Sequence, residues 1–172
     1  MKLSGRIWAL TDQQGTLIQD IDTDMIFHNR YLAETDINRM GQYALDNLEG
    51  WETFPGMAEP GDILITGANF GAGSSRQQAV DCFKILGIQL IIAPSFGAIY
   101  KRNAINSALP IMEAPGIEEF GLKSGDILDI DTVQGVIRCG ERTFEGRPFS
   151  HVQRQILEAG GLFEFGRLRE QG

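Results

Sequence analysis

Short apolar runs alternate with segments of helical periodicity in the middle of the chain. Residues 62–67 (DILITG) and 89–94 (QLIIAP) are rich in branched apolar residues and have no polar face, which predicts two buried strands. Between them, apolar residues recur at helical spacing over 79–86, and Gly87 stands where a helix ends. The order strand, helix, strand predicts a right-handed βαβ unit with parallel strands.

The same alternation extends in both directions. Residues 96–108 predict a second helix and 109–114 a further strand. Near the start, residues 5–12 predict a strand, and the apolar spacing over 36–48 predicts a helix that stops before Gly50.

The pattern changes in the last third of the chain. Residues 122–146 alternate apolar and polar positions around glycine turns, which is typical of antiparallel strands, and residues 151–161 predict a closing helix. The sum is an α/β fold with a mostly parallel core sheet, flanked by helices and extended by antiparallel strands. At 172 residues we expect one domain over 1–172.

Composition and charge narrow the classes of function. The chain is 42% hydrophobic and 22% charged, as globular proteins are, and its net charge of −8 disfavours nucleic acid and anionic lipid as partners. No apolar run approaches the roughly 20 residues of a membrane span, and the first twelve residues lack a signal-peptide core. We therefore expect a cytoplasmic protein without a nucleic-acid or membrane partner.

The sequence does not predict a metal site. Cys82 and Cys139, together with His28 and His151, match no zinc or iron-sulfur spacing. In a reducing compartment both cysteines are expected to be buried free thiols, with a disulfide between them as the alternative.

The segment GANFGAGSSRQQ, residues 67–78, stands where a parallel sheet holds its ligands, at the carboxyl end of a strand. We expect the following helix to begin near Ser74 or Ser75, so that its first N–H groups attract an anion, with Arg76 suited to a carboxylate. The glycine spacing matches neither the phosphate-binding loop nor the dinucleotide fingerprint. A plain helix cap with a solvated arginine is the alternative interpretation.

Three motifs together resemble a known family. GSSR at 73–76, DIDTDMI at 20–26 and SFGAIYKRNAINSALP at 95–110 occur in one chain and in the family's order. The chain resembles the swivelling domain of the aconitase family, most closely the small subunits of 3-isopropylmalate dehydratases. The resemblance covers nearly the whole chain and implies a swivelling β/β/α domain.

The resemblance also implies a reaction and an active site shared between two subunits. The resemblance implies that Ser74 is the catalytic base, that Arg76 binds a substrate carboxylate and that Ser75 lines the same turn. The [4Fe-4S] cluster would lie on a separate large subunit, and the chain would be active only with that partner. The reaction would isomerise a di-acid, a malate derivative of leucine biosynthesis, by dehydration and rehydration. A serine base must act as an alkoxide, which needs nearby N–H donors and a cation.

A second segment would contact the variable substituent of the substrate. Residues 28–36 resemble the family's specificity loop, which includes Tyr31, Leu32, Ala33 and Glu34. Forms that accept a carboxylate-bearing substituent resemble Tyr-Leu-Arg, whereas Ala33 follows Tyr31 and Leu32 here. This favours an isopropyl-like or methyl-like group over homoaconitate, and a methylmalate or a dimethylmalate stays open. The acidic side chain of Glu34 favours neither an apolar nor a carboxylate-bearing substituent.

Several residues have open roles. Asp22 and Asp24, with Thr23, form an Asx-type turn near the substrate, which would place Thr23 or Asp24 beside it, or they simply belong to a solvated loop. Gln77 replaces the family's usual glutamate, and for the cluster Lys101, Arg102 and Asn103 we expect a surface or subunit contact. A function of another class, a non-catalytic anion-binding or regulatory domain on the same fold, also fits the residues.

Overall fold

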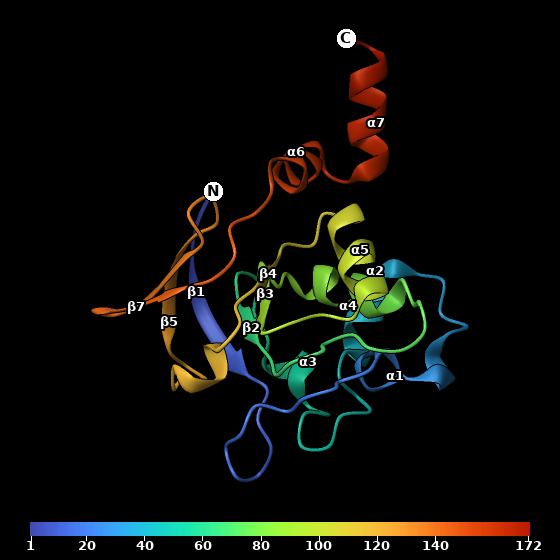
Figure 1. The fold of residues 1–172 in the computed structure, drawn as a ribbon. Coiled ribbons are helices and arrows are strands. Elements are labelled where there is room, and N and C mark those ends of the chain that lie inside the picture. Colours follow the sequence, from blue (N-terminus) through green and yellow to red (C-terminus); the bar gives the residue numbers. More distant parts are fainter.

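The computed structural model describes residues 1–172 and contains one seven-stranded mixed sheet (Figure 1). Its strands, in chain order, are β1 (Lys2–Ala9), β2 (Ile63–Ile65), β3 (Leu90–Ala93), β4 (Ile111–Glu113), β5 (Ile127–Asp131), β6 (Val136–Cys139) and β7 (Arg142–Glu145). Their order across the sheet is β4-β3-β2-β1-β5-β6-β7. The expected α/β architecture is confirmed.

Strand β1 joins a parallel half to an antiparallel half. Ile7 pairs with Ile63 of β2 in a parallel register, and β2, β3 and β4 continue parallel to one another. On its other edge, β1 pairs antiparallel with β5, where Gly5 faces Leu128, and β5, β6 and β7 follow as a meander. The predicted parallel core and antiparallel extension therefore share the first strand of the chain.

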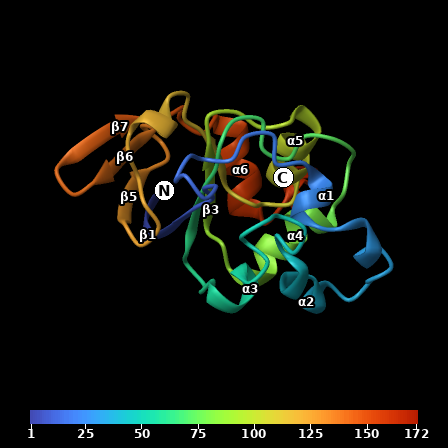
Figure 2. The same ribbon diagram turned by 90° about the horizontal axis from the view of Figure 1, so that it is seen from below.

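The helices are short. The α-helices are α1 (Thr23–Ile26), α2 (Ile37–Met40), α3 (Phe54–Met57), α4 (Gln78–Leu86), α5 (Ala98–Asn106), α6 (His151–Ala159) and α7 (Leu162–Glu170), and the 3-10 turns are η1 (Asn29–Tyr31), η2 (Gly41–Tyr43) and η3 (Ile117–Glu119). Helices α1 to α5 gather beside the parallel half, away from the β5–β7 extension (Figures 1 and 2). None of the helices combines the length and apolar composition needed to cross a bilayer.

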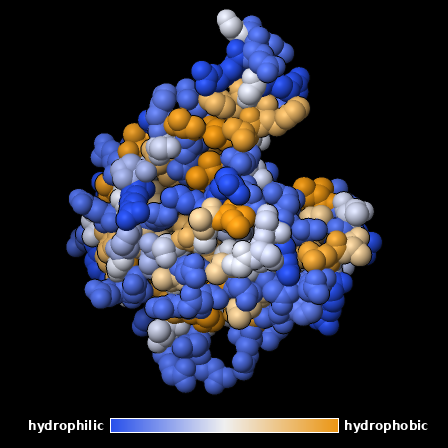
Figure 3. Space-filling model, turned by 45° about the vertical axis from the view of Figure 1, so that its right-hand side comes forward, coloured by the Kyte–Doolittle hydropathy of each residue, from blue (hydrophilic) through white to orange (hydrophobic).

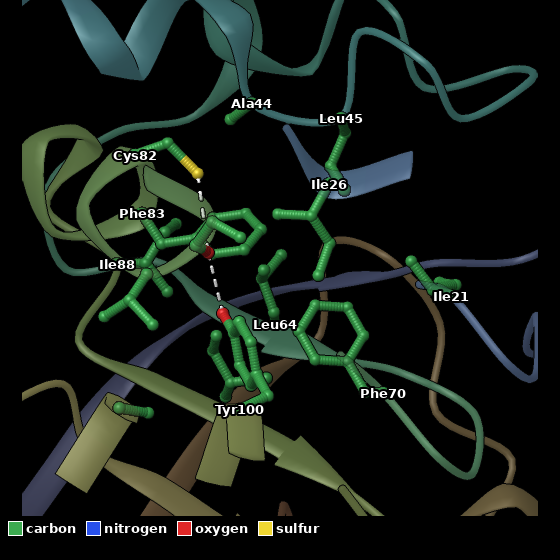
Figure 4. Packing of buried hydrophobic residues seen from close by; sticks show 14 of the residues in the cluster. Ile21, Ile26, Ala44, Leu45, Leu64, Phe70, Cys82, Phe83, Ile88 and Tyr100 are labelled. Carbon is green, nitrogen blue, oxygen red and sulfur yellow. Dashed lines mark hydrogen bonds between the residues drawn. The ribbon is translucent and has the colours of Figure 1, made fainter. Parts of the chain in front are cut away.

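Two hydrophobic clusters cover the two faces of the parallel half. Alternate residues of a strand point to opposite faces, so Leu64 and Ile91 join a cluster of 23 buried residues, while Ile63 and Ile92 join one of 13. The larger cluster lies under α4 and α5 and is drawn in Figure 4. Both cysteines are free: Cys82 is buried in the larger cluster, and Cys139 packs at the edge of the smaller one.

The helix predicted over residues 36–48 is wrong as a continuous element. It breaks into α2, η2 and a turn in which Leu45 has a φ of +61°. Leu45 and Ala44 are fully buried, and the Leu45 N–H donates to the Ile26 carbonyl at 2.8 Å instead of to its own helix. A tertiary hydrogen bond and burial thus replace the helical bonds that the periodicity favoured.

The C-terminus holds a helix that the pattern did not predict. Helix α6 confirms the expectation for residues 151–161, and α7 follows it directly after Gly161, whose φ is +139°. No residue of α7 is buried, and Phe163 is 76% exposed. Figure 3 shows this helix projecting from the body with apolar side chains on its surface. The sequence of α7 has no clear apolar stripe from which a helix could be predicted, and in the structure the helix buries none of its residues.

Candidate active site

The glycine-rich turn links β2 to α4 and is built against helix α5. Gly71 has a φ of +79°, and a Cβ placed there would lie 2.2 Å from Cγ of Tyr100, so only glycine fits. Gly73, with a φ of +96°, reverses the chain directly before the two serines. The turn pairs through single bridges with two other segments, Ala72 with Asp22 and Phe70 with Phe96. The glycines are therefore required by the fold of the turn.

The helix after the turn begins later than its sequence predicts. Helix α4 starts at Gln78, and neither Ser74 nor Ser75 caps it. Both serines are exposed, and the backbone N–H groups of residues 74–77 make no hydrogen bond within the chain. The expected free N–H donors are present, but they belong to the turn before the helix, because the reversal at Gly73 delays the start of helical geometry.

Ser74 is held through its backbone. The Thr23 hydroxyl donates to the Ser74 carbonyl oxygen at 2.9 Å, and the Thr23 N–H donates to the Ala72 carbonyl at 2.9 Å. Thr23 itself is buried at the start of α1. The Ser74 hydroxyl makes no hydrogen bond within the chain. The turn is thus anchored through its backbone, while the Ser74 side chain stays exposed.

Arg76 lies against the DIDTD segment. Its Nη1 donates to the Asp24 carboxylate at 2.8 Å and to the Phe27 carbonyl at 2.9 Å, and the side chain is only 15% exposed. The hydrogen bond from Arg76 holds the pKa of Asp24 below its usual range. The Nε and Nη2 edge of the guanidinium, which suits a carboxylate in a bidentate manner, makes no bond within the chain.

Asp24 is fixed from several sides. Besides Arg76, its Oδ1 accepts from the Asn29 N–H at 2.9 Å, and its Oδ2 accepts from Nδ2 of Asn47 at 3.1 Å. Asp24 therefore links the turn to the start of the predicted specificity loop. Phe27 and Asn47 were not predicted as site residues, and no local pattern marks them, because they meet the turn only in the folded chain.

Helix α5 contacts the other side of the turn. Nδ2 of Asn103 donates to the Ser75 hydroxyl oxygen at 2.9 Å. Nε2 of Gln77 donates to Asp81 at 3.1 Å and to the Ser107 hydroxyl at 2.7 Å, which a glutamate at 77 is unable to do, since it carries no amide protons.

The neighbours of Asn103 are arranged differently. Lys101 forms an ion pair with Glu113 at 2.9 Å, whereas Arg102 is exposed and unpaired. Of the three clustered residues, only Asn103 makes a hydrogen bond with the turn.

The predicted specificity loop is anchored at one end through Tyr31. The Tyr31 hydroxyl donates to Asp46 at 2.7 Å, which raises the pKa of Tyr31, and its ring stacks on Tyr43 with centroids 4.0 Å apart. Leu32 packs against the larger hydrophobic cluster. No hydrogen bond or ion pair joins residues 31–34 to residues 74–76.

The two remaining loop residues differ in exposure. The Glu34 carboxylate turns back to accept from the Asp36 N–H at 3.0 Å and to pair with Arg39 at 3.4 Å. Its charge is therefore held within the loop. Ala33 is exposed.

A metal site does not fit this chain. No three His, Cys, Asp or Glu side chains lie close enough together to hold a metal ion, and the two cysteines lie in different hydrophobic clusters. The largest cavity, about 730 Å³, is lined by the 11–19 and 47–51 segments with Met25, and it excludes the turn. The turn instead exposes Gly73, Ser74 and Ser75 to solvent.

Comparisons with known proteins agree with this geometry. The aconitase C-terminal domain family matches residues 16–115. The 3-isopropylmalate dehydratase small subunit of Caldicellulosiruptor bescii is 40% identical over 148 residues, covering 85% of this chain and 87% of the relative. That of Pyrobaculum aerophilum is 39% identical and covers 96% of this chain and 97% of the relative.

A solved structure shows the same fold. The crystal structure of 3-isopropylmalate dehydratase from Methanocaldococcus jannaschii superposes with a TM-score of 0.85 at 34% identity, covering 99% of this chain and 96% of that one. The resemblance carried by the three motifs is thereby confirmed. The chain belongs to the aconitase C-terminal domain family, among the small subunits of 3-isopropylmalate dehydratases.

Proposed function

We propose that this chain is the small subunit of a hydro-lyase that isomerises 3-isopropylmalate and 2-isopropylmalate by dehydration and rehydration. Residues 1–172 would act as one swivelling domain that brings Ser74 and Arg76 to a site shared with a large subunit. The observation that carries the proposal is the turn itself: an exposed serine hydroxyl without a partner, beside unpaired N–H groups and a guanidinium with a free edge.

In this proposal Ser74 takes the proton from the carbon next to a substrate carboxylate. The negative charge on that carboxylate grows as the proton leaves, and the free edge of Arg76 binds it. A serine hydroxyl is a weak base in water, so the oxygen must act as an alkoxide stabilised by donors. The unpaired N–H groups of residues 74–77 supply such donors within the same turn.

We assign Thr23 and Asp24 to positioning. Thr23 holds the Ser74 carbonyl, and Asp24 binds Nη1 of Arg76, which leaves the other edge of the guanidinium free for a substrate carboxylate. An Asx-type turn is present as well, because Asp22 caps α1 through the Met25 N–H at 2.8 Å. In the acidic segment, Asp22 is thus a structural residue, and in our proposal Thr23 and Asp24 position the groups of the site.

The [4Fe-4S] cluster expected of this family is assigned to the large subunit. The residues of this chain do not fit such a cluster, because no three potential ligands lie close together. The open surface around the turn supports a site completed by another polypeptide, since enclosed pockets bury most of a small ligand's surface.

Reconstitution tests the proposed function. The purified chain alone is expected to show no dehydratase activity, and addition of a cluster-loaded large subunit is expected to restore conversion of 3-isopropylmalate. Turnover is measured spectroscopically as the unsaturated intermediate forms, with a panel that includes a methylmalate, a dimethylmalate and homoaconitate. Activity of the chain alone, or no activity with any of these substrates in an assembled complex, would contradict the proposal.

Replacing Ala33 with arginine is expected to change substrate preference. Ala33 is exposed and the charge of Glu34 is already paired, so a new guanidinium has room and no unpaired acid beside it. The kcat/KM ratio of homoaconitate to an isopropyl substrate should rise by roughly tenfold or more, because a distal carboxylate gains a partner. Ala33→Leu is the uncharged control. An equal shift of this kcat/KM ratio in both variants would show that the size of residue 33, and not its charge, determines substrate preference.

A further inference from the structure

One face of helix α5 lies beside residues 75–79, which lead from the serine turn (residues 73–77, the end of the glycine-rich turn) into α4. Tyr100, Asn103 and Ser107 lie at positions i, i+3 and i+7, which share a face of an α-helix. Each of them makes a hydrogen bond with a different part of the segment 75–79. The helix therefore acts as a rigid support for the turn.

The two outer contacts of this face are structural. The Tyr100 hydroxyl is buried and donates to the Ala79 carbonyl at 2.9 Å (Figure 4). Its ring fills the space that a side chain at Gly71 would need. Ser107 accepts from Gln77. Both contacts act on the backbone or on the start of α4, and neither reaches the hydroxyl groups of the turn.

The middle contact is different because it reaches a hydroxyl group of the turn. Nδ2 of Asn103 donates to the Ser75 oxygen at 2.9 Å. A serine hydroxyl has one proton to donate and two positions at which to accept. When Asn103 occupies an acceptor position, the Ser75 proton is free to point toward the open side of the turn, where Ser75 is exposed.

We propose that Asn103 is a positioning residue of the reaction: it donates to Ser75 and so sets the Ser75 hydroxyl as a donor toward a substrate oxygen. The inference rests on the proposed function and adds to it a residue outside the serine turn. It also separates Asn103 from Lys101, which pairs with Glu113, and from Arg102, which is exposed and makes no hydrogen bond or ion pair with the turn.

A double-mutant cycle in the reconstituted complex tests this inference. Asn103→Ala alone is expected to lower kcat/KM about tenfold, the size of one hydrogen bond. If Asn103 acts through Ser75, the double variant Asn103→Ala with Ser75→Ala should be no slower than Ser75→Ala alone, within about twofold. Independent losses that multiply, or a fully active Asn103→Ala complex, would overturn the inference.

Asn103→Asp distinguishes a positioning role from a merely structural one. Aspartate has nearly the shape of asparagine, so a structural role predicts a milder effect than that of alanine. A carboxylate only accepts hydrogen bonds, however, and would take the Ser75 proton for itself. The positioning role therefore predicts that Asn103→Asp is slower than Asn103→Ala. The reverse order would overturn it.

The matched control lies on the same helix. Asn106 is the other asparagine of α5, and its side chain makes no hydrogen bond within the chain. Asn106→Ala is expected to keep wild-type kcat/KM, and all variants should assemble with the large subunit. If the wild-type complex itself is inactive, the proposed function fails. If it is active and the Asn103 variants match Asn106→Ala, only the positioning role of Asn103 fails.

Discussion

Replacing Ser74 with alanine is expected to lower kcat of the reconstituted complex by about 10³-fold or more, the range that a general base contributes. The Ser74 hydroxyl makes no hydrogen bond within the chain and is exposed, so its removal leaves no buried group without a partner. The thermal midpoint of the chain and its assembly with the large subunit should therefore be unchanged, as for other surface substitutions.

Ser75→Ala is the matched control for this result. It removes the same atoms one residue along the same exposed turn, but in our proposal it affects a hydrogen bond to the substrate and not the proton transfer. We expect a loss of about tenfold. Wild-type turnover by an assembled Ser74→Ala complex would exclude Ser74 as the base, and a larger loss from Ser75→Ala would assign that role to the second serine.

Replacing Asp62 with alanine is expected to destabilise the chain by about 3 kcal/mol. Asp62 is 4% exposed at the start of β2, where its carboxylate accepts from Arg6 Nη2 at 2.7 Å, from Trp8 Nε1 at 2.7 Å and from the Glu59 N–H at 2.8 Å. Alanine leaves Trp8 Nε1 and the Glu59 N–H without an acceptor and removes an ion-pair partner of Arg6. For a chain of this size the thermal midpoint should fall by roughly 6–12 °C, measured by calorimetry.

The effect of Asp62 should depend on pH. Burial alone would raise the pKa of Asp62, but the hydrogen bonds from Arg6, the Glu59 N–H and Trp8 outweigh it and lower the pKa. A carboxyl whose pKa is lowered on folding stabilises the protein above its unfolded pKa of about 3.9, and this stabilisation is lost as the pH falls through the folded value. The difference between wild type and Asp62→Ala should be greatest near neutral pH and shrink below about pH 4.

Asp129→Ala serves as the control for Asp62. Asp129 lies on β5 with its side chain exposed, and it makes no side-chain hydrogen bond or ion pair within the chain. Its replacement should change stability by no more than about 0.5 kcal/mol. Equal midpoints for the two variants at pH 7 would show that the Asp62 hydrogen bonds do not stabilise the fold.

Local sequence patterns were sufficient to predict the strands of the parallel half of the sheet. Runs such as 89–94 are apolar on both faces, which is typical of a strand buried on both sides. Gly87 ended α4 with a φ of +78°, as its position indicated. The helix over 36–48 was wrong because Leu45 bonds to Ile26, a partner 19 residues away (45 − 26) that periodicity does not reveal.

For the site, the sequence by itself determined the residue types and their order: two serines and an arginine after glycines at the end of a strand, with an acidic segment upstream. Only the tertiary structure decided that Asp24 binds Arg76, that Thr23 holds Ser74, and that Asn103 reaches Ser75. These contacts join residues 28 to 52 positions apart. Hydrogen-bond partners at such separations depend on how whole segments pack, whereas turn chemistry and strand burial are properties of a few adjacent residues.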